Sequence, residues 1–534
     1  MAFIETSLLF AEAVRQAYMS GEEDYNMKPF VLADCKGKPV GLIEDGDSVI
    51  FCCKRGEREV QLTDCFVLTD FSYFPRKEFR NLRFVVFTLY HHKYIPLGVP
   101  VAFKPKPMKN TLAEVISSYN LKQLHVAESE KFAHVTFFFN GGSNVTFSGE
   151  TDLVIPSPKD VPFELVPQLS LPKVASVLTE ALQQKEFDLI VANFANGDVI
   201  GHTSNFEAKV LCAREVDKHL QQVVETALQN GYTVVVTADH GILETGLKPN
   251  GKPNVSHTNE PVPFVIVNSL LKGLKLKRGR LANVAPTILQ LMGLQIPNEF
   301  EDTLLSEKLL RTVDRILLLI LDGWGIGKKD ATNPIHVANT RYFNYLAENF
   351  SFTLLSASGE DVGLLPGKPG NSEAGHMNIG AGRIVLQDDV IIQRSMNDGT
   401  FFENPVLIEA VEMVNSTNGK LHIIGLLSEK SSHGTLEYII RTLELAKFRN
   451  LNNALVHLIL DGRSTEPGSA PEMIINLGKT LKQIGIGTIC TVVGRGIALD
   501  RSGDYLGKTK VAYDALVYGI GRHVRLDLAR CTVP

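Results

Sequence analysis

The chain of 534 residues carries 54 basic and 59 acidic side chains, for a net charge of −5, and 44% of it is hydrophobic. This length exceeds one ordinary hydrophobic core and predicts two or three domains. The charge balance excludes a standing attraction to nucleic acids or anionic membranes, so neither is expected as a partner.

The N-terminal stretch carries Glu5 and Glu12 within an apolar pattern. This pattern predicts an amphipathic helix, because a signal peptide has a basic start and an uninterrupted apolar core. No segment reaches the roughly 18 apolar residues that a membrane span needs. We therefore expect a soluble, cytoplasmic protein.

Short apolar runs recur along the chain, each closed by a polar or glycine-containing turn, at 187–194, 232–241, 261–268, 315–325, 420–428, 453–463 and 487–495. Apolar runs without alternation predict parallel strands that are buried on both faces. Helices are predicted between them, such as 208–231, which ends on a glycine. Alternating strands and helices predict an α/β fold, in which ligands bind at the carboxyl ends of the strands.

Two segments are predicted to connect domains. Residues 96–110 contain four prolines, which suit neither a helix nor a central strand. Residues 386–388 follow a glycine-rich stretch.

Residues that suit metal ions stand in strand-end or loop motifs: Asp198, His202, Asp239, His240, His257, Asp322 and Ser372. Mixed nitrogen and oxygen ligands favour manganese, zinc or cobalt over calcium. A serine beside two metals suggests a nucleophile that coordination activates. The spacings alone also fit exposed helix pairs and turn residues, so they leave both interpretations open.

Four motifs then carry a resemblance: NGDVIGHT at 196–203, ADHG at 238–241 with SHT at 256–258, LDGWG at 321–325 and GNSEAGHMNIGAGR at 370–383. They resemble the metal motifs of the cofactor-independent (2,3-bisphosphoglycerate-independent) phosphoglycerate mutases, within the alkaline phosphatase superfamily. Together with ESEKFAHVTFFFNGG at 128–142, the resemblance covers nearly the whole chain. It implies an α/β protein of two domains, an alkaline-phosphatase-like metal domain with a largely parallel sheet and a second α/β substrate domain.

The resemblance also implies a ligand set and a reaction. Asp198, His202 and His257 would hold one divalent metal. Asp239, His240, Asp322 and Ser372 would hold the other, with Ser372 as the phosphorylated nucleophile. Mn²⁺ is favoured, and Mg²⁺, Co²⁺ and Zn²⁺ stay open. The implied activity is the interconversion of 3-phosphoglycerate and 2-phosphoglycerate in glycolysis and gluconeogenesis, by a monomer.

Phosphoglycerate is a multiply charged anion, so its site needs several guanidinium or ammonium groups. The residues that resemble the family's substrate-binding positions are Arg55, Arg58, Lys131, His433, Arg463, Ser464, Arg495 and Arg501. The histidine resembles one that contacts the transferring phosphoryl group.

Three departures from the family lie in this set. The family's S-D-G-G-V-H reads SEKSSH at 428–433, its F-N-F-R-P-D-R reads CCKRGER at 52–58, and its D-G-R-D reads DGRS at 461–464. The last departure replaces a candidate general base by Ser464. The serine hydroxyl cannot accept a proton as a general base near neutral pH. Glu466 is the candidate to replace it. Two alternatives therefore stay open: a metal-dependent phosphatase of the same superfamily, or a catalytically weakened homologue that binds phosphoglycerate.

The order of the motifs differs from the family, because ADHG precedes LDGWG here. This order predicts a circular permutation, which proteins tolerate when the joined ends lie close together. The phosphatase-like metal domain would then be continuous, over 107–386. The substrate (transferase) domain would be split between 1–102 and 389–534.

Overall fold

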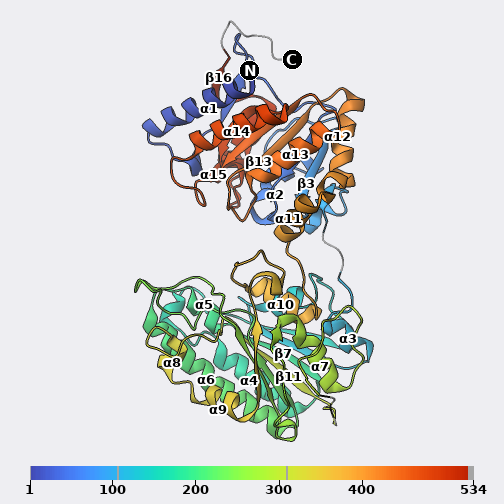
Figure 1. Ribbon diagram of the computed structural model, residues 1–534, viewed down its shortest axis with the longest axis vertical. Helices are drawn as coiled ribbons and strands as arrows, with labels where there is room; N and C mark the ends of the chain where they lie inside the picture. Colours follow the sequence, from blue (N-terminus) through green and yellow to red (C-terminus); the bar gives the residue numbers. More distant parts are fainter. Residues whose placement is uncertain (1, 105–107, 308, 310, 527–534) are drawn as a thin grey trace. The chain divides into compact units, whose positions relative to one another are not determined.

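The computed structural model describes residues 2–104, 108–307, 309 and 311–526. The chain forms two compact units. We call Met1–Pro105 together with Ile391–Pro534 the split unit, and Lys106–Val390 the continuous unit. Each unit is built around one eight-stranded sheet with helices, so the protein is an α/β protein of two domains (Figure 1).

The sheet of the split unit contains, in spatial order, β16 (Arg522–Arg525), β1 (Phe30–Ala33), β15 (Thr488–Gly494), β14 (Ala454–Leu460), β13 (Leu421–Leu427), β2 (Ser48–Cys52), β3 (Arg83–Thr88) and β4 (Val101–Phe103). Described neighbours are parallel except for β1 and β15. The α-helices assigned to this unit are α1 (Ala2–Met19), α2 (Gly56–Val67), α11 (Asp388–Asp398), α12 (Pro405–Thr417), α13 (Leu436–Phe448), α14 (Ala470–Ile484), α15 (Arg495–Ala498) and α16 (Lys510–Val517).

The sheet of the continuous unit contains, in spatial order, β10 (Gly279–Arg280), β12 (Ser351–Ser356), β9 (Val262–Val267), β8 (Thr233–Thr237), β11 (Ile316–Leu321), β7 (Leu189–Phe194), β5 (Gln123–Glu128) and β6 (Glu150–Ile155). Its described strands are parallel to their neighbours except for β9, which is antiparallel to β8 and β12. The α-helices assigned to this unit are α3 (Leu112–Ser118), α4 (Leu171–Gln184), α5 (Asn196–Gly201), α6 (Phe206–Gln229), α7 (Val284–Met292), α8 (Pro334–Ala338), α9 (Arg341–Asn349) and α10 (Ser372–Ala381).

The seven apolar runs all form strands: β7, β8, β9, β11, β13, β14 and β15. The prediction of parallel pairing is wrong for β9, although every residue of this strand is buried. Burial on both faces, and not strand direction, therefore produces a continuous apolar run.

The predicted connections contain some regular structure. Residues 96–110 include β4, a short strand at the edge of its sheet that follows Pro100. Prolines are tolerated near an edge strand, because the N–H groups on its outer side have no neighbouring strand to bond. The chain returns to the split unit at Ile391, inside α11.

The sheet of the split unit is buried on both faces, because successive strand residues enter different hydrophobic clusters. Ile50 and Cys52 of β2 belong to a cluster with residues of α1, α12, α13 and α14. Val49 and Phe51 belong to a second cluster with residues of α2 and α16. Burying one such side chain contributes about 1.5–3 kcal/mol, so both helix layers hold the sheet in place.

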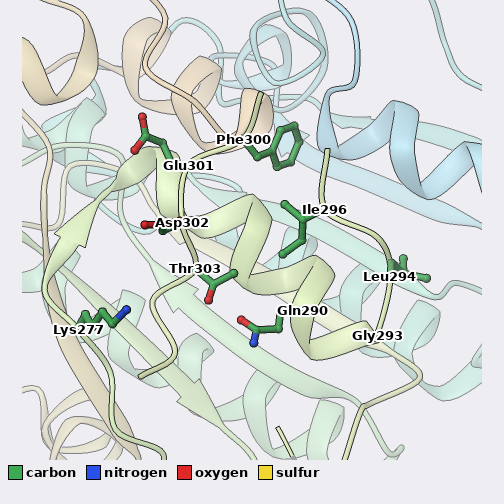
Figure 2. Close-up of a pocket in the computed structure, with 9 residues that line it drawn as sticks. All are labelled: Lys277, Gln290, Gly293, Leu294, Ile296, Phe300, Glu301, Asp302 and Thr303. Carbon is green, nitrogen blue, oxygen red and sulfur yellow. The ribbon is translucent and has the colours of Figure 1, made fainter. Parts of the chain in front are cut away.

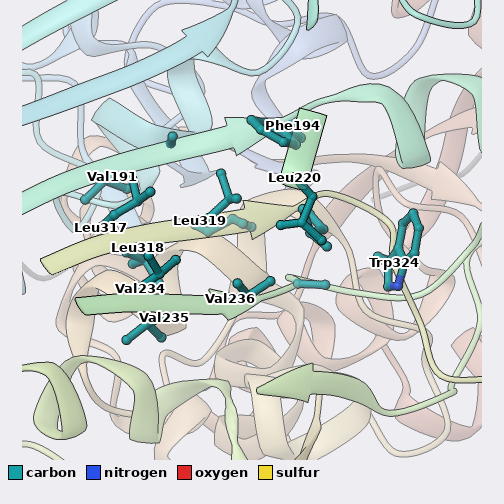
Figure 3. Close-up of a cluster of buried hydrophobic side chains, with 14 of the residues drawn as sticks. Val191, Phe194, Leu220, Val234, Val235, Val236, Leu317, Leu318, Leu319 and Trp324 are labelled. Carbon is teal, nitrogen blue, oxygen red and sulfur yellow. The ribbon is translucent and has the colours of Figure 1, made fainter. Parts of the chain in front are cut away.

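The continuous unit has one large hydrophobic cluster. Figure 3 shows Val191 of β7, Leu317–Leu319 of β11 and Val234–Val236 of β8 on neighbouring strands, with Leu220 of α6 and Trp324 nearby. These strands carry the polar residues described below at their carboxyl ends. Separately, none of the helices in the described part of the chain has the length and apolarity that a bilayer crossing requires.

A buried polar chain crosses the split unit's sheet from strand to strand. The Asp47 carboxylate lies 2.9 Å from His422 Nε2, His422 Nδ1 lies 2.9 Å from His457 Nε2, and His457 Nδ1 lies 2.9 Å from Thr491 Oγ1. The carboxylate accepts, so the tautomers follow: each imidazole donates from Nε2, and the Thr491 hydroxyl donates to the last Nδ1. Burial lowers the pKa of both histidines.

We predict that this chain makes folding sensitive to acid. Below about pH 6.5 the unfolded chain binds protons on His422 and His457 while the folded chain does not, so stability falls as the pH falls, by up to about 1.4 kcal/mol per pH unit for each histidine. His457→Gln should cost about 1–3 kcal/mol at pH 7, because it breaks a buried network. It should also flatten the pH dependence of the urea midpoint between pH 7 and 5. The control His523→Gln changes an exposed histidine of the same unit and should keep the wild-type slope; equal slopes in both variants would contradict the assignment.

Candidate metal centre

Three aspartates follow the carboxyl ends of adjacent parallel strands in the continuous unit. Asp239 follows β8, Asp322 follows β11, and Asp198 lies in α5, just after β7. All three are buried. Because the sheet order is β8-β11-β7, the topology brings their carboxylates together at one edge.

Ser372 is the first residue of α10, and its hydroxyl lies among these carboxylates. The Asn371 side chain caps the helix by accepting from Ala374 N at 2.8 Å. A Cβ at Gly375 would lie 2.6 Å from the Asp239 carbonyl oxygen, so only glycine lets α10 approach this strand end. Ser372 Oγ consequently lies 3.0 Å from His240 Nε2 and donates to Asp322 Oδ1 at 3.2 Å.

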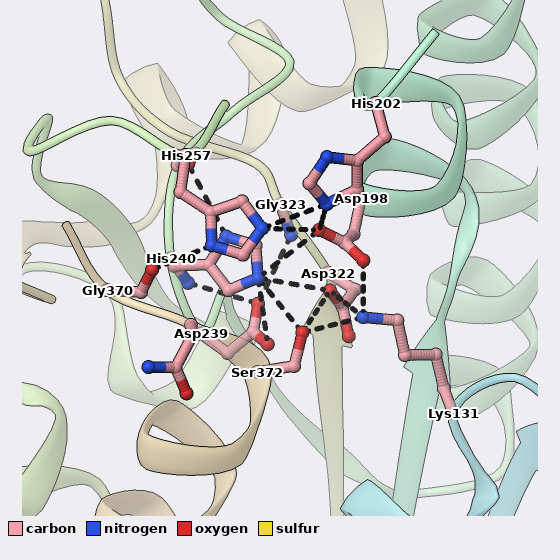
Figure 4. A network of polar contacts seen from close by, with 12 residues as sticks. Lys131, Asp198, His202, Asp239, His240, His257, Asp322, Gly323, Gly370 and Ser372 are labelled. Atoms are coloured by element: carbon pink, nitrogen blue, oxygen red, sulfur yellow. Dashed lines mark hydrogen bonds and ion pairs between the residues drawn. The ribbon is translucent and has the colours of Figure 1, made fainter. Parts of the chain in front are cut away.

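Lys131, predicted to bind the substrate, lies in the middle of this group. Its Nζ donates to Asp198 Oδ2 at 2.7 Å, to Asp322 Oδ1 at 2.9 Å and to Ser372 Oγ at 2.6 Å (Figure 4). Burial disfavours the ammonium charge, but Asp322 and Asp198 outweigh burial and raise the Lys131 pKa. The lysine thus stays charged and offsets part of the carboxylate repulsion.

Two histidines turn their Nε2 atoms toward Asp198. His257 Nδ1 lies 2.7 Å from Gly370 O, and His202 Nδ1 lies 2.9 Å from Val255 O. A carbonyl can only accept, so each Nδ1 carries a proton, and in the neutral imidazole each Nε2 keeps its lone pair. These Nε2 atoms lie 3.1 Å and 3.3 Å from Asp198 Oδ1 (Figure 4).

The donor set fits divalent cations. At this edge of the sheet, two groups place their ligand atoms within 4.8 Å of one another: Asp198, His240 and His257 form one, and Asp239, His240 and Asp322 the other. Asp198 Oδ1 and Asp239 Oδ2 are buried without a hydrogen-bond partner in the described structure. An orphaned carboxylate oxygen that faces imidazole lone pairs is unfavourable unless a cation lies between them.

Two supporting residues were missed from the sequence. Asn193 Nδ2 donates to Asp322 Oδ2 at 2.7 Å and lies 2.9 Å from His376 Nε2. His376 Nδ1 also lies 2.9 Å from the Ser372 carbonyl oxygen and 3.2 Å from Asp239 Oδ2. The four-residue spacing of Ser372 and His376 was a usable signal, because residues four apart share one face of a helix.

The remaining predicted residues lie in the split unit, near the carboxyl ends of β2, β13, β14 and β15. The Arg495 guanidinium contacts the Asp461 carboxylate and lies 3.4 Å from Ser431 Oγ. Arg58 donates to Leu499 O at 3.1 Å and to Tyr25 OH at 3.3 Å. His433 Nδ1 lies 2.8 Å from Glu59 Oε1. Glu59 was not singled out from the sequence, because a glutamate in a charged helix gives no sign that it is buried.

Other predicted residues of this set are exposed. Arg55 and Arg501 both contact Glu57, at 2.8 Å each. Arg463, Ser464 and Glu466 lie in the exposed loop after β14, where Ser464 N donates to Asp461 Oδ2 at 3.0 Å.

A separate cavity of about 610 Å³ lies in the continuous unit, beside the end of α7. Figure 2 shows Gln290 and Ile296 among its lining residues, with the segment Phe300–Thr303. None of the predicted site residues lines it.

Comparison with known proteins agrees with this chemistry. A family model described as the Metalloenzyme superfamily matches residues 23–296. A second model, described as the BPG-independent PGAM N-terminus, matches residues 392–531.

Similar curated proteins carry one name. The "2,3-bisphosphoglycerate-independent phosphoglycerate mutase" of Listeria welshimeri is 39% identical over 300 residues, which are 56% of this chain and 58% of that protein. The "2,3-bisphosphoglycerate-independent phosphoglycerate mutase 1" of Methanosarcina acetivorans is 42% identical over 289 residues, which are 54% of this chain and 55% of that protein. The matches thus span a little over half of these relatives. A solved structure of Leishmania mexicana phosphoglycerate mutase at low cobalt concentration aligns at 28% identity and a TM-score of 0.40, over 51% of this chain and 53% of that one.

We predict that divalent cations stabilise the folded protein through this centre. At a cation concentration about 100 times the dissociation constant, binding at one site adds about 2.7 kcal/mol. Protein stripped with a chelator should melt at a lower temperature than protein with Mn²⁺. His257→Ala, which removes a ligand from a loop, should reduce both this difference and the bound manganese measured by elemental analysis. The control His336→Gln alters an exposed histidine of the same unit and should change neither; an unaltered manganese content in His257→Ala would contradict the assignment.

Proposed function

The chain belongs to the Metalloenzyme superfamily, and on that basis we propose that it interconverts 3-phosphoglycerate and 2-phosphoglycerate through a phosphorylated Ser372. The observation that carries the proposal is the position of Ser372 Oγ, 2.6 Å from Lys131 Nζ and 3.2 Å from Asp322 Oδ1. An oxygen with an adjacent acceptor and an adjacent cation is suited to nucleophilic attack. The names of the similar curated proteins support phosphoglycerate as the substrate.

The residues of the continuous unit take the phosphoryl group. Ser372 Oγ attacks phosphorus in line while its proton passes to Asp322 Oδ1. Lys131 offsets the charge that develops on the phosphoryl oxygens, and the amino end of α10 adds partial positive charge at Ser372. In the second half of the reaction glycerate takes the group back on its other hydroxyl, and Ser372 recovers its proton.

Two divalent cations are part of the proposal, one held by Asp198, His202 and His257, the other by Asp239, His240, Asp322 and Ser372. Bound there, they would supply Lewis-acid charge to the phosphoryl group. Mn²⁺ suits this mixed set of imidazole, carboxylate and hydroxyl ligands.

The split unit would hold the substrate. Its cationic groups near the strand ends suit the carboxylate and phosphate of phosphoglycerate, because guanidinium binds both in a bidentate manner. They are Arg55, Arg58, Arg463, Arg495 and Arg501, with His433 and Ser464 beside them.

A circular permutation of the chain also belongs to the proposal. The support is that a family model described as an N-terminus matches residues 392–531, after the Metalloenzyme match at 23–296. Asp239 precedes Asp322 in this chain, and their strands β8 and β11 are parallel neighbours. A cytoplasmic location and a monomeric state stay predictions of the sequence analysis.

The test is an assay that follows 2-phosphoglycerate and free phosphate together, starting from 3-phosphoglycerate. A mutase forms 2-phosphoglycerate, a phosphatase releases phosphate, and a binding protein does neither. Ser372→Ala should lower mutase turnover by about 10³-fold or more, because the nucleophile is lost. Intact-mass measurement of quenched protein should show one added phosphoryl group that the variant lacks. The control Ser269→Ala changes an exposed serine of the same unit and should behave as wild type; an active Ser372→Ala variant would refute the assignment.

A further inference from the structure

Glu59 and His433 form a buried acid–imidazole pair in the split unit. Glu59 lies in α2 and His433 in the loop after β13, and the distance from Glu59 Oε1 to His433 Nδ1 is 2.8 Å. The two side chains are 0% and 4% exposed. The other carboxylate oxygen, Oε2, accepts from Arg58 N at 3.1 Å. The carboxylate is therefore fixed from both sides.

This geometry leaves one ring nitrogen of His433 available. Nδ1 faces the Glu59 carboxylate, and no described residue makes a hydrogen bond with Nε2. The backbone N of His433 donates to Ser431 Oγ at 3.3 Å, and Ser431 Oγ lies 3.4 Å from Arg495 Nη1. The pair thus lies beside a guanidinium that suits an anionic substrate.

Two other carboxylates of this region already contact guanidinium groups. Asp461 contacts the Arg495 guanidinium and accepts from Ser428 Oγ at 3.0 Å. Glu57 accepts from Arg55 and Arg501, at 2.8 Å each. Ser464 is a neutral, exposed hydroxyl. The Glu59–His433 pair differs from these groups, because His433 Nε2 makes no hydrogen bond with a described residue.

A carboxylate that accepts from Nδ1–H holds the imidazole in one orientation and leaves Nε2 for another partner. Burial raises the pKa of Glu59, and the hydrogen bond with His433 opposes that rise. The pair is therefore arranged to accept and return a proton at Nε2.

We propose that His433 Nε2 exchanges the proton of the glycerate hydroxyls and that Glu59 is its positioning residue, an inference that rests on the proposed mutase function. When Ser372 Oγ bonds to phosphorus, the bond from phosphorus to the substrate oxygen breaks, and Nε2 gives its proton to that oxygen. When the other hydroxyl attacks phosphoserine, its proton passes to Nε2 and the Ser372 Oγ–phosphorus bond breaks. His433 ends the cycle protonated, as it began.

The test compares Glu59→Gln, His433→Gln and the double variant in the mutase assay. Glu59→Gln keeps the shape of the side chain and removes its charge. We expect kcat to fall by about 10²–10⁴-fold, the usual contribution of general acid–base catalysis, with KM nearly unchanged. If the wild-type kcat changes with pH because of the Glu59–His433 pair, this change should be absent in Glu59→Gln. Because Glu59 acts through His433, Glu59→Gln should cost nothing further in the His433→Gln background.

Asp47→Asn is the matched control, because it alters another buried carboxylate–histidine pair of the same unit, Asp47–His422 at 2.9 Å. It should reduce stability and leave kcat and its pH profile as in wild type. A rise in kcat of tenfold or more in Ser464→Asp would overturn the inference, because it would assign the missing proton acceptor to that loop. Full kcat in Glu59→Gln, or independent losses in the two single variants, would overturn the inference.

A second measurement separates this inference from the proposed function. In protein labelled with ¹⁵N-histidine, His433→Gln identifies the His433 ring signals without substrate. We expect Nδ1 protonated in wild type, with the proton no longer confined to Nδ1 in Glu59→Gln. If wild type shows this tautomer but has no mutase activity, the proposed function is wrong and the Glu59–His433 hydrogen bond still stands. An Nε2–H tautomer in wild type would remove the positioning role whatever the activity.

Discussion

The repulsion among three buried carboxylates is the constraint on which the continuous unit depends. Two unit charges 4 Å apart interact with about 4 kcal/mol at an effective dielectric constant of 20, and Asp198, Asp239 and Asp322 are all buried at one edge of the sheet. Lys131 contributes one positive charge to three negative ones. A divalent cation would suit the remaining negative charge, because the histidine Nε2 atoms face the same carboxylates.

The sheet keeps these charges in place because the energy of its core exceeds their repulsion. Every residue of β7, β8 and β11 is buried, and each large apolar side chain contributes about 1.5–3 kcal/mol. The strands therefore hold the three carboxylates at fixed separations whether or not a cation is bound. Gly375 then allows α10 to approach Asp239 closely, so packing also holds Ser372 Oγ within 3.2 Å of Asp322 Oδ1.

In the split unit, positively charged groups gather near the strand ends. Two of its guanidinium groups already have an anionic partner: Arg495 contacts Asp461, and Arg501 contacts Glu57. In the proposed function, an anionic substrate would therefore replace a carboxylate as the partner of each guanidinium group. Such a site selects by geometry, because only a ligand that satisfies the guanidinium groups as well as the carboxylates do can compete.

The sequence by itself determined the α/β class, the positions of the buried strands and the identity of the residues suited to metals. These features are local, since apolar runs and strand-end motifs are written in consecutive residues. Only the tertiary structure decided that β9 runs antiparallel, that Lys131 lies between Asp198 and Asp322, and that Glu59 is buried against His433. Residues 59 and 433 stand 374 positions apart, and a charged side chain shows its charge in the sequence, whereas its burial and its partner depend on how the whole chain packs.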